Sequence, residues 1–308
     1  MLELAVIVLR LAQLAGAMIL FGAPLFLAYA LPREGPACGA QTPWARPLLG
    51  WTAAGLLAAS LAGLLAQTSV LAGSIREGMQ PASLSAVVTT MAMGPSSLVR
   101  ATAAALALAT VLAARPSLSA FRICSALGAA ACASFAWMGH GAATEGPGRL
   151  LHLIADIVHA LAAAGWIGAL VVFFALLRRP PDDPPWRGAL HQALHGFAGV
   201  GSGLVAVLVA SGLVNSWFLV GPQRISGLWT TPYGQLLSLK LLLFAGMLGL
   251  AAANRFRLTP TLKAALDHGQ PAGPALAALR RSLVLETTLA FAVLGLVAWL
   301  GTLAPVAE

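Results

Sequence analysis

Eight apolar stretches, each about as long as a bilayer-spanning helix, account for most of this sequence of 308 residues. Taken between Gly, Pro and charged breakers, they lie near residues 4–30, 48–71, 96–114, 118–139, 151–177, 196–220, 235–253 and 282–303. With 59% hydrophobic and only 9% charged residues, the chain has more apolar surface than a soluble core of this size could bury. Because a backbone inside lipid must satisfy its own hydrogen bonds, such spans are helical. The sequence therefore predicts an all-α fold, a polytopic membrane bundle of about eight transmembrane helices that forms one integral membrane domain over residues 1–308.

The positively charged residues collect on one side of these predicted spans. A net charge of +8 would suggest a nucleic-acid partner in a soluble protein, but here the cations flank apolar segments. The expected partner is therefore the lipid bilayer, and no nucleic acid is expected. Loops on the cytoplasmic side of a membrane protein carry an excess of Lys and Arg. The side that is richer in Lys and Arg is therefore predicted to be cytoplasmic, and both termini are predicted to be periplasmic. The richer side carries Arg33, Arg46, Arg115, Arg122, Arg178, Arg179, Arg187, Arg255, Arg257, Lys263, Arg280 and Arg281, and the other side carries Arg76, Arg149 and Arg224.

Two kinds of connection join the spans. The segment from Pro81 to Met93 is moderately apolar but is broken by Gly94-Pro95, so it predicts a surface or re-entrant helix rather than a ninth span. The stretches 179–185 and 260–274 are predicted to be the longest hydrophilic loops, and neither is long enough for a soluble domain.

The predicted span 151–177 carries His152, Asp156 and His159 near its start, and spacings of four and three residues place them on one helical face. Ionisable groups inside a span are costly, which favours a function. The alternative is that His152 lies among headgroups while the other two hydrogen-bond neighbouring helices. Seven residues at about 1.5 Å rise put the two histidine backbones roughly 10 Å apart, too far for easy capture of one ion without a further ligand. Either a neighbouring helix completes one site, or the face is a ladder of two weaker sites.

Further metal-type donors fall on the same predicted outer side of the membrane. Imidazole and thioether ligands together suit copper, since Cu(I) prefers sulfur and Cu(II) prefers nitrogen. We therefore predict a copper ion at this side. Methionine is also a common core filler, which is the alternative interpretation of Met91-x-Met93. The predicted metal ligands are His159, His152, Asp156, His140, Met138, Met91 and Met93.

Three cations are predicted at about the depth of Asp156, namely Arg10, Arg100 and Lys240. One carboxylate cannot neutralise three cations, although long side chains can reach the headgroups. If the cations instead line one cavity, they favour an anionic group such as a haem propionate. The alternative cofactor is thus haem b, with His140 and His159 as axial ligands and Arg10, Arg100 and Lys240 at the propionates.

Several polar residues outside this set have simpler expected roles. His191 and His195, at the opposite end of the bundle, would serve a second stacked haem in that alternative, or are a solvated helix start. Glu286 is expected to meet a nearby arginine. Asn215 is expected to hydrogen-bond between helices.

The second half of the chain, about residues 150–303, resembles the copper-resistance protein D family, CopD or PcoD, and the eight-span layout agrees throughout. His159, Trp166 and Gly168 match the histidine and the Trp-x-Gly signature of that family, and Tyr233, Gly234 and Lys240 match its Tyr-Gly…Lys signature. Ala169 stands where many members have a second glycine. The resemblance rests on Trp166, Gly168, the segment Ser211–Asn215, Tyr233, Lys240, Asn254 and Arg255.

The resemblance implies a multi-pass protein of the bacterial inner membrane that takes up or handles copper, often together with a small periplasmic copper carrier of the CopC type. We expect the ion to be captured at the periplasmic side by His and Asp, with Met as an optional further donor, and then to pass between the helices. The alternatives are a b-type haem-containing electron carrier and an assembly factor that delivers copper to another protein. No ATP-binding loop and no catalytic set are visible in the sequence, so an enzyme is not expected.

Overall fold

The eight predicted spans are present as eight long helices. The computed structural model describes residues 2–30, 43–139, 144, 146–178, 184–268 and 272–306, without the side chains at 184–189, 191, 192, 195, 198, 266 and 267. Within these ranges all regular structure is helical, which confirms the all-α membrane fold. The long helices are α1 (Leu2–Ala30), α3 (Ala45–Leu71), α6 (Met93–Ala113), α7 (Leu118–Ala133), α9 (Arg149–Leu177), α10 (Pro184–Leu219), α12 (Pro232–Ala253) and α14 (Gly273–Leu300).

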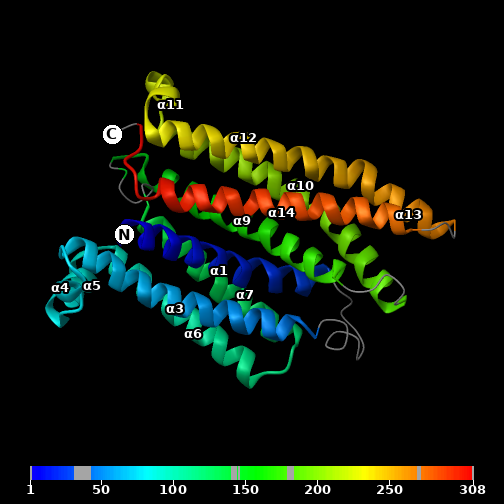
Figure 1. Ribbon diagram of the computed structural model, residues 1–308, viewed down its shortest axis with the longest axis horizontal. Helices are drawn as coiled ribbons and strands as arrows, with labels where there is room; N and C mark the ends of the chain where they lie inside the picture. The colour runs from blue at the N-terminus through cyan, green and yellow to red at the C-terminus, as the bar shows by residue number, and fades with distance from the viewer. Residues whose placement is uncertain are drawn as a thin grey trace.

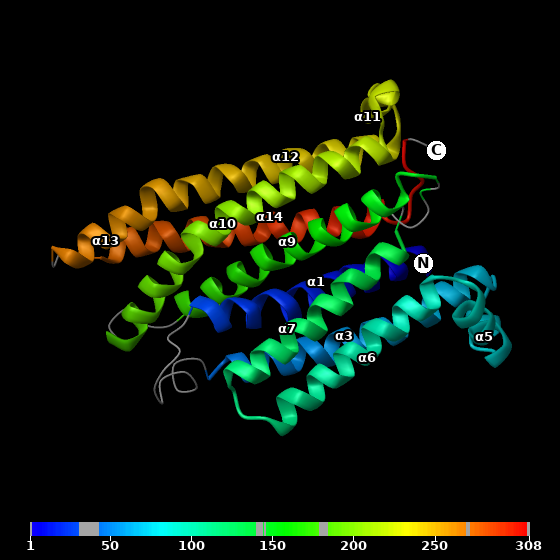
Figure 2. The ribbon, with the colours of Figure 1, turned by 180° about the vertical axis from the view of Figure 1, so that it is seen from behind.

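These helices run along one common direction, and both chain ends lie at the same end of the bundle (Figure 1). We call this the terminal end; it also carries the short helices α4 (Ile75–Gly78), α5 (Pro81–Thr90) and α11 (Gly227–Thr230) (Figure 2). The opposite end, beside α13 (Thr259–Asp267), is the α13 end. The short surface helix predicted after Pro81 is α5.

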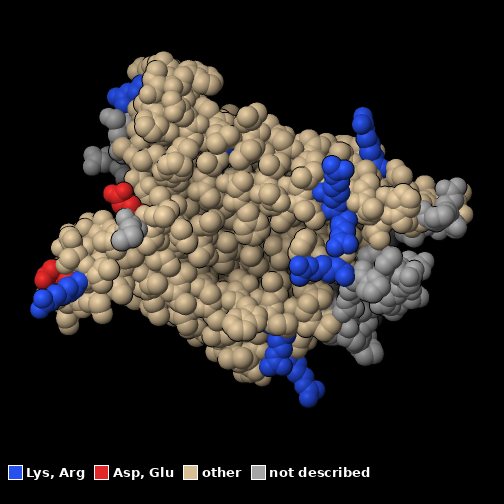
Figure 3. Space-filling view, in the orientation of Figure 1, with Lys and Arg blue, Asp and Glu red and all other residues tan. Residues whose placement is uncertain are grey.

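Lys and Arg side chains gather around the α13 end, whereas the terminal end shows a few charges of both signs (Figure 3). The asymmetry comes from cations at the helix ends on this side. Arg46 and Arg122 lie in the first turns of α3 and α7, Arg115 lies just before α7, and Arg280 and Arg281 lie near the start of α14. This is the charge pattern on which the predicted orientation depends.

Three segments are more helical than the apolar pattern predicts. Helix α10 begins at Pro184 rather than near 196, and α14 begins at Gly273 rather than near 282. The predicted hydrophilic loop at 260–274 is wrong over α13, whose second residue is Pro260. A π-helical turn, Asn254–Leu258, interrupts the regular i to i−4 hydrogen bonds just before this proline, which has no N–H to contribute. Apolar runs mark the part of a helix that lies in lipid, so they miss such polar extensions.

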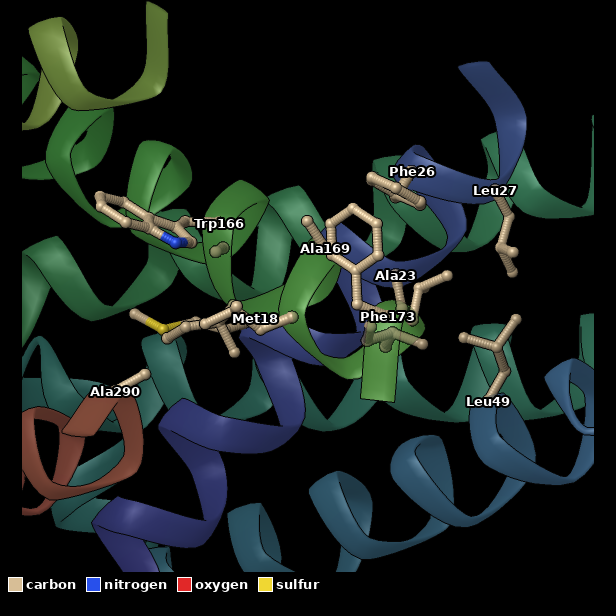
Figure 4. Packing of buried hydrophobic residues seen from close by; sticks show 14 of the residues in the cluster. Met18, Ala23, Phe26, Leu27, Leu49, Trp166, Ala169, Phe173 and Ala290 are labelled. Atoms are coloured by element: carbon tan, nitrogen blue, oxygen red, sulfur yellow. The ribbon is translucent and has the colours of Figure 1, made fainter. Parts of the chain in front are cut away.

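Helix α1 lies at the centre of the bundle and packs against α3, α7, α9 and α14. Its contact with α9 includes Phe26 and Phe173, whose ring centroids lie 5.2 Å apart at 67° (Figure 4). The closest approach is at Gly22 and Gly168, where an added Cβ on either residue would overlap the backbone of the other helix. This close approach at Gly168 fixes the position of α9 next to α1.

Candidate functional site

The first three turns of α9 carry the predicted polar face, and the structure gives its two histidines different surroundings. His152 is only 1% exposed. Its ring stacks on Phe218 of α10 at 4.7 Å and 8°, and its Nδ1 lies 2.6 Å from Thr144 Oγ1. His152 is thus built into the contact between the start of α9 and the end of α10.

His159 points toward the middle of α10, where its Nδ1 lies 3.0 Å from Ser211 Oγ. The Ser211 hydroxyl also lies 2.6 Å from the carbonyl oxygen of Val207, and a carbonyl can only accept. The single hydroxyl proton is therefore donated to Val207, and Ser211 Oγ accepts a hydrogen bond from Nδ1–H of His159. This assignment leaves the lone pair of the imidazole on Nε2, the arrangement found in metal-binding histidines that are oriented by a second hydrogen bond.

Asp156 is partly buried one turn before His159. Its Oδ1 lies 3.4 Å from Asn215 Nδ2, so Asn215 makes the predicted contact between α9 and α10. A Cβ added at Gly139 would lie 3.6 Å from Asp156 Oδ2, so the backbone just before His140 passes beside this carboxylate. His140 itself lies outside the described residues.

Two cations from other helices act on this pair. Arg10 of α1 and Lys240 of α12 both interact electrostatically with Asp156, and Lys240 also interacts with His159. Arg10 donates from Nη1 to the carbonyl oxygen of Gly301 at 3.0 Å, while its buried Nε has no hydrogen-bond partner among the described residues. Side chains from α1, α9, α10 and α12 therefore meet near the terminal end, and we call His159, Asp156, Asn215, Arg10 and Lys240 the α9 polar cluster.

Arg100 of α6 forms a second polar centre, and its charge interacts with that of Arg10 in the α9 polar cluster. It is fully buried, and it donates to Ser134 Oγ at 3.1 Å, Ser97 Oγ at 3.2 Å and Met138 Sδ at 2.8 Å. Its guanidinium carbon also lies 4.1 Å from the centroid of the Phe135 ring. The predicted ligand Met138 thus has its sulfur against a cation.

The other predicted ligands are placed as follows. Met91 is 41% exposed and Met93 is partly buried at the junction of α5 and α6. Helix α5 packs on α6 and α3, and α6 packs mainly on α3 and α7. The structure does not bring these sulfurs to α9. Among the described residues there is no group of three or more His, Cys, Asp or Glu side chains that could hold a metal ion. Of the predicted donors, the α9 polar cluster brings together only His159 and Asp156. The side chains of His191 and His195 are among those that the structure does not describe.

A third polar centre, which the sequence analysis did not identify, lies about halfway along α14. Glu286 is 2% exposed and accepts hydrogen bonds from Trp166 Nε1 and from Asn254 Nδ2, each at 2.8 Å. The expected arginine partner of Glu286 is therefore replaced by two neutral donors. In the sequence, only the presence of a carboxylate inside an apolar span could have drawn attention to this site.

Tyr233, the tyrosine of the Tyr-Gly…Lys signature, is buried. It is 5% exposed and packs with Val220, Leu237 and Leu300 in a small apolar cluster at the start of α12. This cluster holds α12 against the ends of α10 and α14, close to Lys240.

Two protein-family models match this chain. The family model described as Copper resistance protein D matches residues 191–300, and the model described as Copper resistance protein D-like, N-terminal domain, matches residues 1–150. The chain is 40% identical over 309 residues to Copper resistance protein D of Pseudomonas syringae pv. tomato, which covers 98% of this chain and 97% of that protein. It is 32% identical over 137 residues to inner membrane protein YebZ of Escherichia coli (strain K12), covering 44% of this chain and 45% of that protein.

No solved structure matches the chain. Helix α9 lies between the two matched family segments but inside the full-length match. With its eight spans and these relatives, the chain is a multi-pass protein of the bacterial inner membrane with a copper-related function, and it belongs to the copper resistance protein D family.

Proposed function

We propose that this protein takes up copper across the inner membrane and that the α9 polar cluster captures the ion at the periplasmic side. The proposal assigns the terminal end to the periplasm, in line with the gathering of cations at the α13 end (Figure 3). It describes a carrier rather than an enzyme. Copper is the cargo, and it reaches the protein from the periplasm, where a small carrier of the CopC type is the proposed donor.

The observation that carries the proposal is the hydrogen bond from His159 to Ser211. A histidine that donates from Nδ1 to a fixed acceptor presents Nε2 as a ligand atom in a defined direction. Imidazole nitrogen is a good ligand for copper, and the carboxylate of Asp156 one turn away provides a second donor and a negative charge.

The cations in the cluster weaken the binding of the ion and so shorten its residence time. At an effective dielectric constant near 20, each unit charge about 8 Å away changes the energy of a bound monovalent ion by about 2 kcal/mol. Arg10 and Lys240 together outweigh Asp156, so electrostatics alone disfavours a bare cation here. Binding must then come from coordination by His159, completed by a further ligand such as His140 or one that arrives with the ion. A site that is occupied but not too stable suits passage.

Copper retention by purified variants tests the assignment. In His159→Ala we expect bound copper to fall by about tenfold or more, because losing a ligand should cost at least as much as losing one of its supporting hydrogen bonds. His268→Ala is the matched control, since His268 is exposed just after α13 and its Nδ1 bonds to the carbonyl oxygen of Ala264, one turn earlier. Unchanged retention in His159→Ala would rule out this ligand, even though the family assignment would stand.

A b-type haem carrier is the second candidate, and one observation favours it. The buried Nε atoms of Arg10 and Arg100 both lack a hydrogen-bond partner among the described residues, and propionate oxygens would satisfy them. The absorption spectrum of the purified protein separates the two functions: a Soret band supports haem, and bound copper without that band supports copper handling. Copper that binds to His159 but does not enter sealed vesicles would instead identify an assembly factor.

A further inference from the structure

The carboxylate of Glu286 is buried about halfway along α14, between α9 and the junction of α12 with α13. Trp166 donates to Oε1 and Asn254 donates to Oε2, so each oxygen has one fixed N–H donor. Figure 4 shows Trp166 on α9 and, one turn beyond Glu286 on α14, Ala290, both among the packed apolar residues of the bundle. The carboxylate therefore lies on a part of α14 that packs inside the bundle, where Glu286 is 2% exposed.

Among the described residues, no cation pairs with Glu286. Its side chain interacts with Trp166 and Asn254 through the two hydrogen bonds. Other titratable and charged side chains lie on α14 and on the elements that pack against it. They are Glu3, Arg10 and Tyr29 on α1, Arg149, His152, Asp156 and His159 on α9, Tyr233 and Lys240 on α12, Arg255 and Arg257 in the π-helical turn, Lys263 and Asp267 on α13, and Arg280 and Arg281 on α14. His159 precedes Trp166 by seven residues, which is roughly 10 Å along α9. Ionisable groups inside membrane proteins without a structural counter-ion mark ion pathways and proton relays.

Two oxygen atoms beside Glu286 are buried without any hydrogen-bond partner among the described residues. They are Asn254 Oδ1 and Ser282 Oγ, and their residues are 9% and 7% exposed. Asn254 already contacts Glu286 through its nitrogen, and Ser282 precedes Glu286 by one turn on the same face of α14. Residues four apart on a helix have Cβ atoms about 5–6 Å apart, so the serine hydroxyl lies within reach of the glutamate side chain or of one bridging water. Unpaired buried acceptors are uncommon and need an explanation.

These atoms suit both charge states of a carboxyl group. An ionised carboxylate accepts hydrogen bonds only, which Trp166 and Asn254 provide. A protonated carboxyl also donates one hydrogen bond, and the unpaired oxygens of Asn254 and Ser282 are acceptors for it. Asn254 opens a π-helical turn, a distortion often found at functional sites, and this turn places it against α14.

We propose that Glu286, Trp166, Asn254 and Ser282 form a proton-binding site, and that loading of this site is coupled to copper movement. In the loading step, one oxygen of the carboxylate takes a proton from a hydronium ion, which leaves a neutral carboxylic acid and water; the reverse step returns the proton to water. The coupling rests on the proposed copper transport, whereas the proton site does not.

Infrared difference spectroscopy of the full-length protein over a range of pH tests the proton site. We expect a carbonyl stretching band of a protonated carboxylic acid that grows as pH falls and is missing in Glu286→Gln. Glu77→Gln is the control, because Glu77 is exposed near the terminal end and bonds to Gln80, and this variant should keep the band. Absence of any band that depends on Glu286 overturns the proposal.

Further variants keep the test decisive if Glu286→Gln does not fold. Trp166→Phe and Ser282→Ala each remove one hydrogen-bonding group and should shift the band, and a band that stays in place in both overturns the assignment. Adding Na⁺ at constant pH separates a proton site from a metal-cation site. Loss of the band on adding Na⁺ would also overturn the proposal.

Coupling is tested in sealed vesicles loaded with the intact protein. We expect an imposed pH gradient to change the initial rate of copper uptake severalfold in the unmodified protein and not in Glu286→Gln. Equal responses would overturn the coupling and leave the proton site intact. Absence of copper uptake under all conditions would instead contradict the proposed transport function.

Discussion

Nδ1 of His159 and the hydroxyl oxygen of Ser211 lie 3.0 Å apart and join α9 to α10 near the terminal end of the bundle. Because Ser211 donates its own proton to Val207, this contact determines which imidazole nitrogen keeps its lone pair free, and so which nitrogen would bind an ion in the proposed copper site. The role of His159 therefore depends on a residue 52 positions away in the sequence.

Replacing Ser211 with Ala should weaken copper binding without removing the ligand. Loss of a hydrogen bond that orients a metal-binding histidine typically lowers metal affinity by about 10–100-fold. A copper titration of purified protein measures this. Ser202→Ala is the control on the same helix, because Ser202 bonds to Arg255. Equal affinity in both variants would show that Ser211 does not orient a ligand.

Substituting Gly168 with Ala should destabilise the bundle. The added Cβ would overlap the backbone at Gly22, so α1 and α9 must separate, and overpacking of this kind costs about 1–3 kcal/mol. The midpoint of thermal unfolding in detergent reports the change. Gly203→Ala, on α10 with no atom within 4 Å of the added Cβ, should leave the midpoint unchanged or raise it slightly. A midpoint in Gly168→Ala no lower than in that control would contradict the close packing.

Arg100→Met should be among the more destabilising single changes. It leaves Ser97 and Ser134 without the charged donor that they share, and each hydrogen bond to a charged group contributes about 1.5–3 kcal/mol. Detergent unfolding compares this variant with Arg122→Met, an exposed arginine on α7. If the two variants unfold at the same temperature, Arg100 has no structural role. A gain of stability in Arg100→Met would show that the desolvation of the arginine outweighs its contacts.

Trp166→Phe should lower stability by about 1.5–3 kcal/mol, because it removes the N–H donor to Glu286 while keeping most of the apolar ring. Trp217→Phe is the matched control, since Trp217 is 65% exposed on α10. Chemical unfolding followed by circular dichroism measures both. Combining Trp166→Phe with Glu286→Gln should cost less than the sum of the single changes, because the two residues share one hydrogen bond.

Single cysteines at positions 77 and 263 should be labelled from opposite sides of the membrane. Glu77 lies near the terminal end and Lys263 near the α13 end, and both are exposed. The charge asymmetry predicts that a membrane-impermeant thiol reagent added to whole cells, with the outer membrane permeabilised, labels Glu77→Cys and spares Lys263→Cys. These variants carry Ala at Cys38, Cys124 and Cys132. Labelling in the reverse order would invert the orientation and move the α9 polar cluster to the cytoplasmic side.

Local sequence patterns were sufficient to predict the membrane fold, because each span must be apolar over its whole length and breakers separate the spans. They missed the polar starts of α10 and α14 for the same reason, since Pro184 and Gly273 begin helices outside the apolar runs. Spacing also placed His159 and Asp156 together, because they share one helix.

The partners of these residues could not be predicted from spacing. Glu286 meets Trp166 and Asn254 across 120 and 32 residues, and only the three-dimensional packing of α9, α12 and α14 determines that contact. The same limit applies to His152 and His159, which share a helical face but bond to Thr144 and to Ser211 respectively.

The contact of Gly22 with Gly168 also restricts where an ion could travel. Backbone meets backbone at that crossing, so no space for a hydrated or partly hydrated ion remains between α1 and α9 at that depth. If an ion moves from His159 toward the α13 end, as the proposed transport requires, its path lies on a side of α9 that faces away from α1, such as the sides toward α10 and α14.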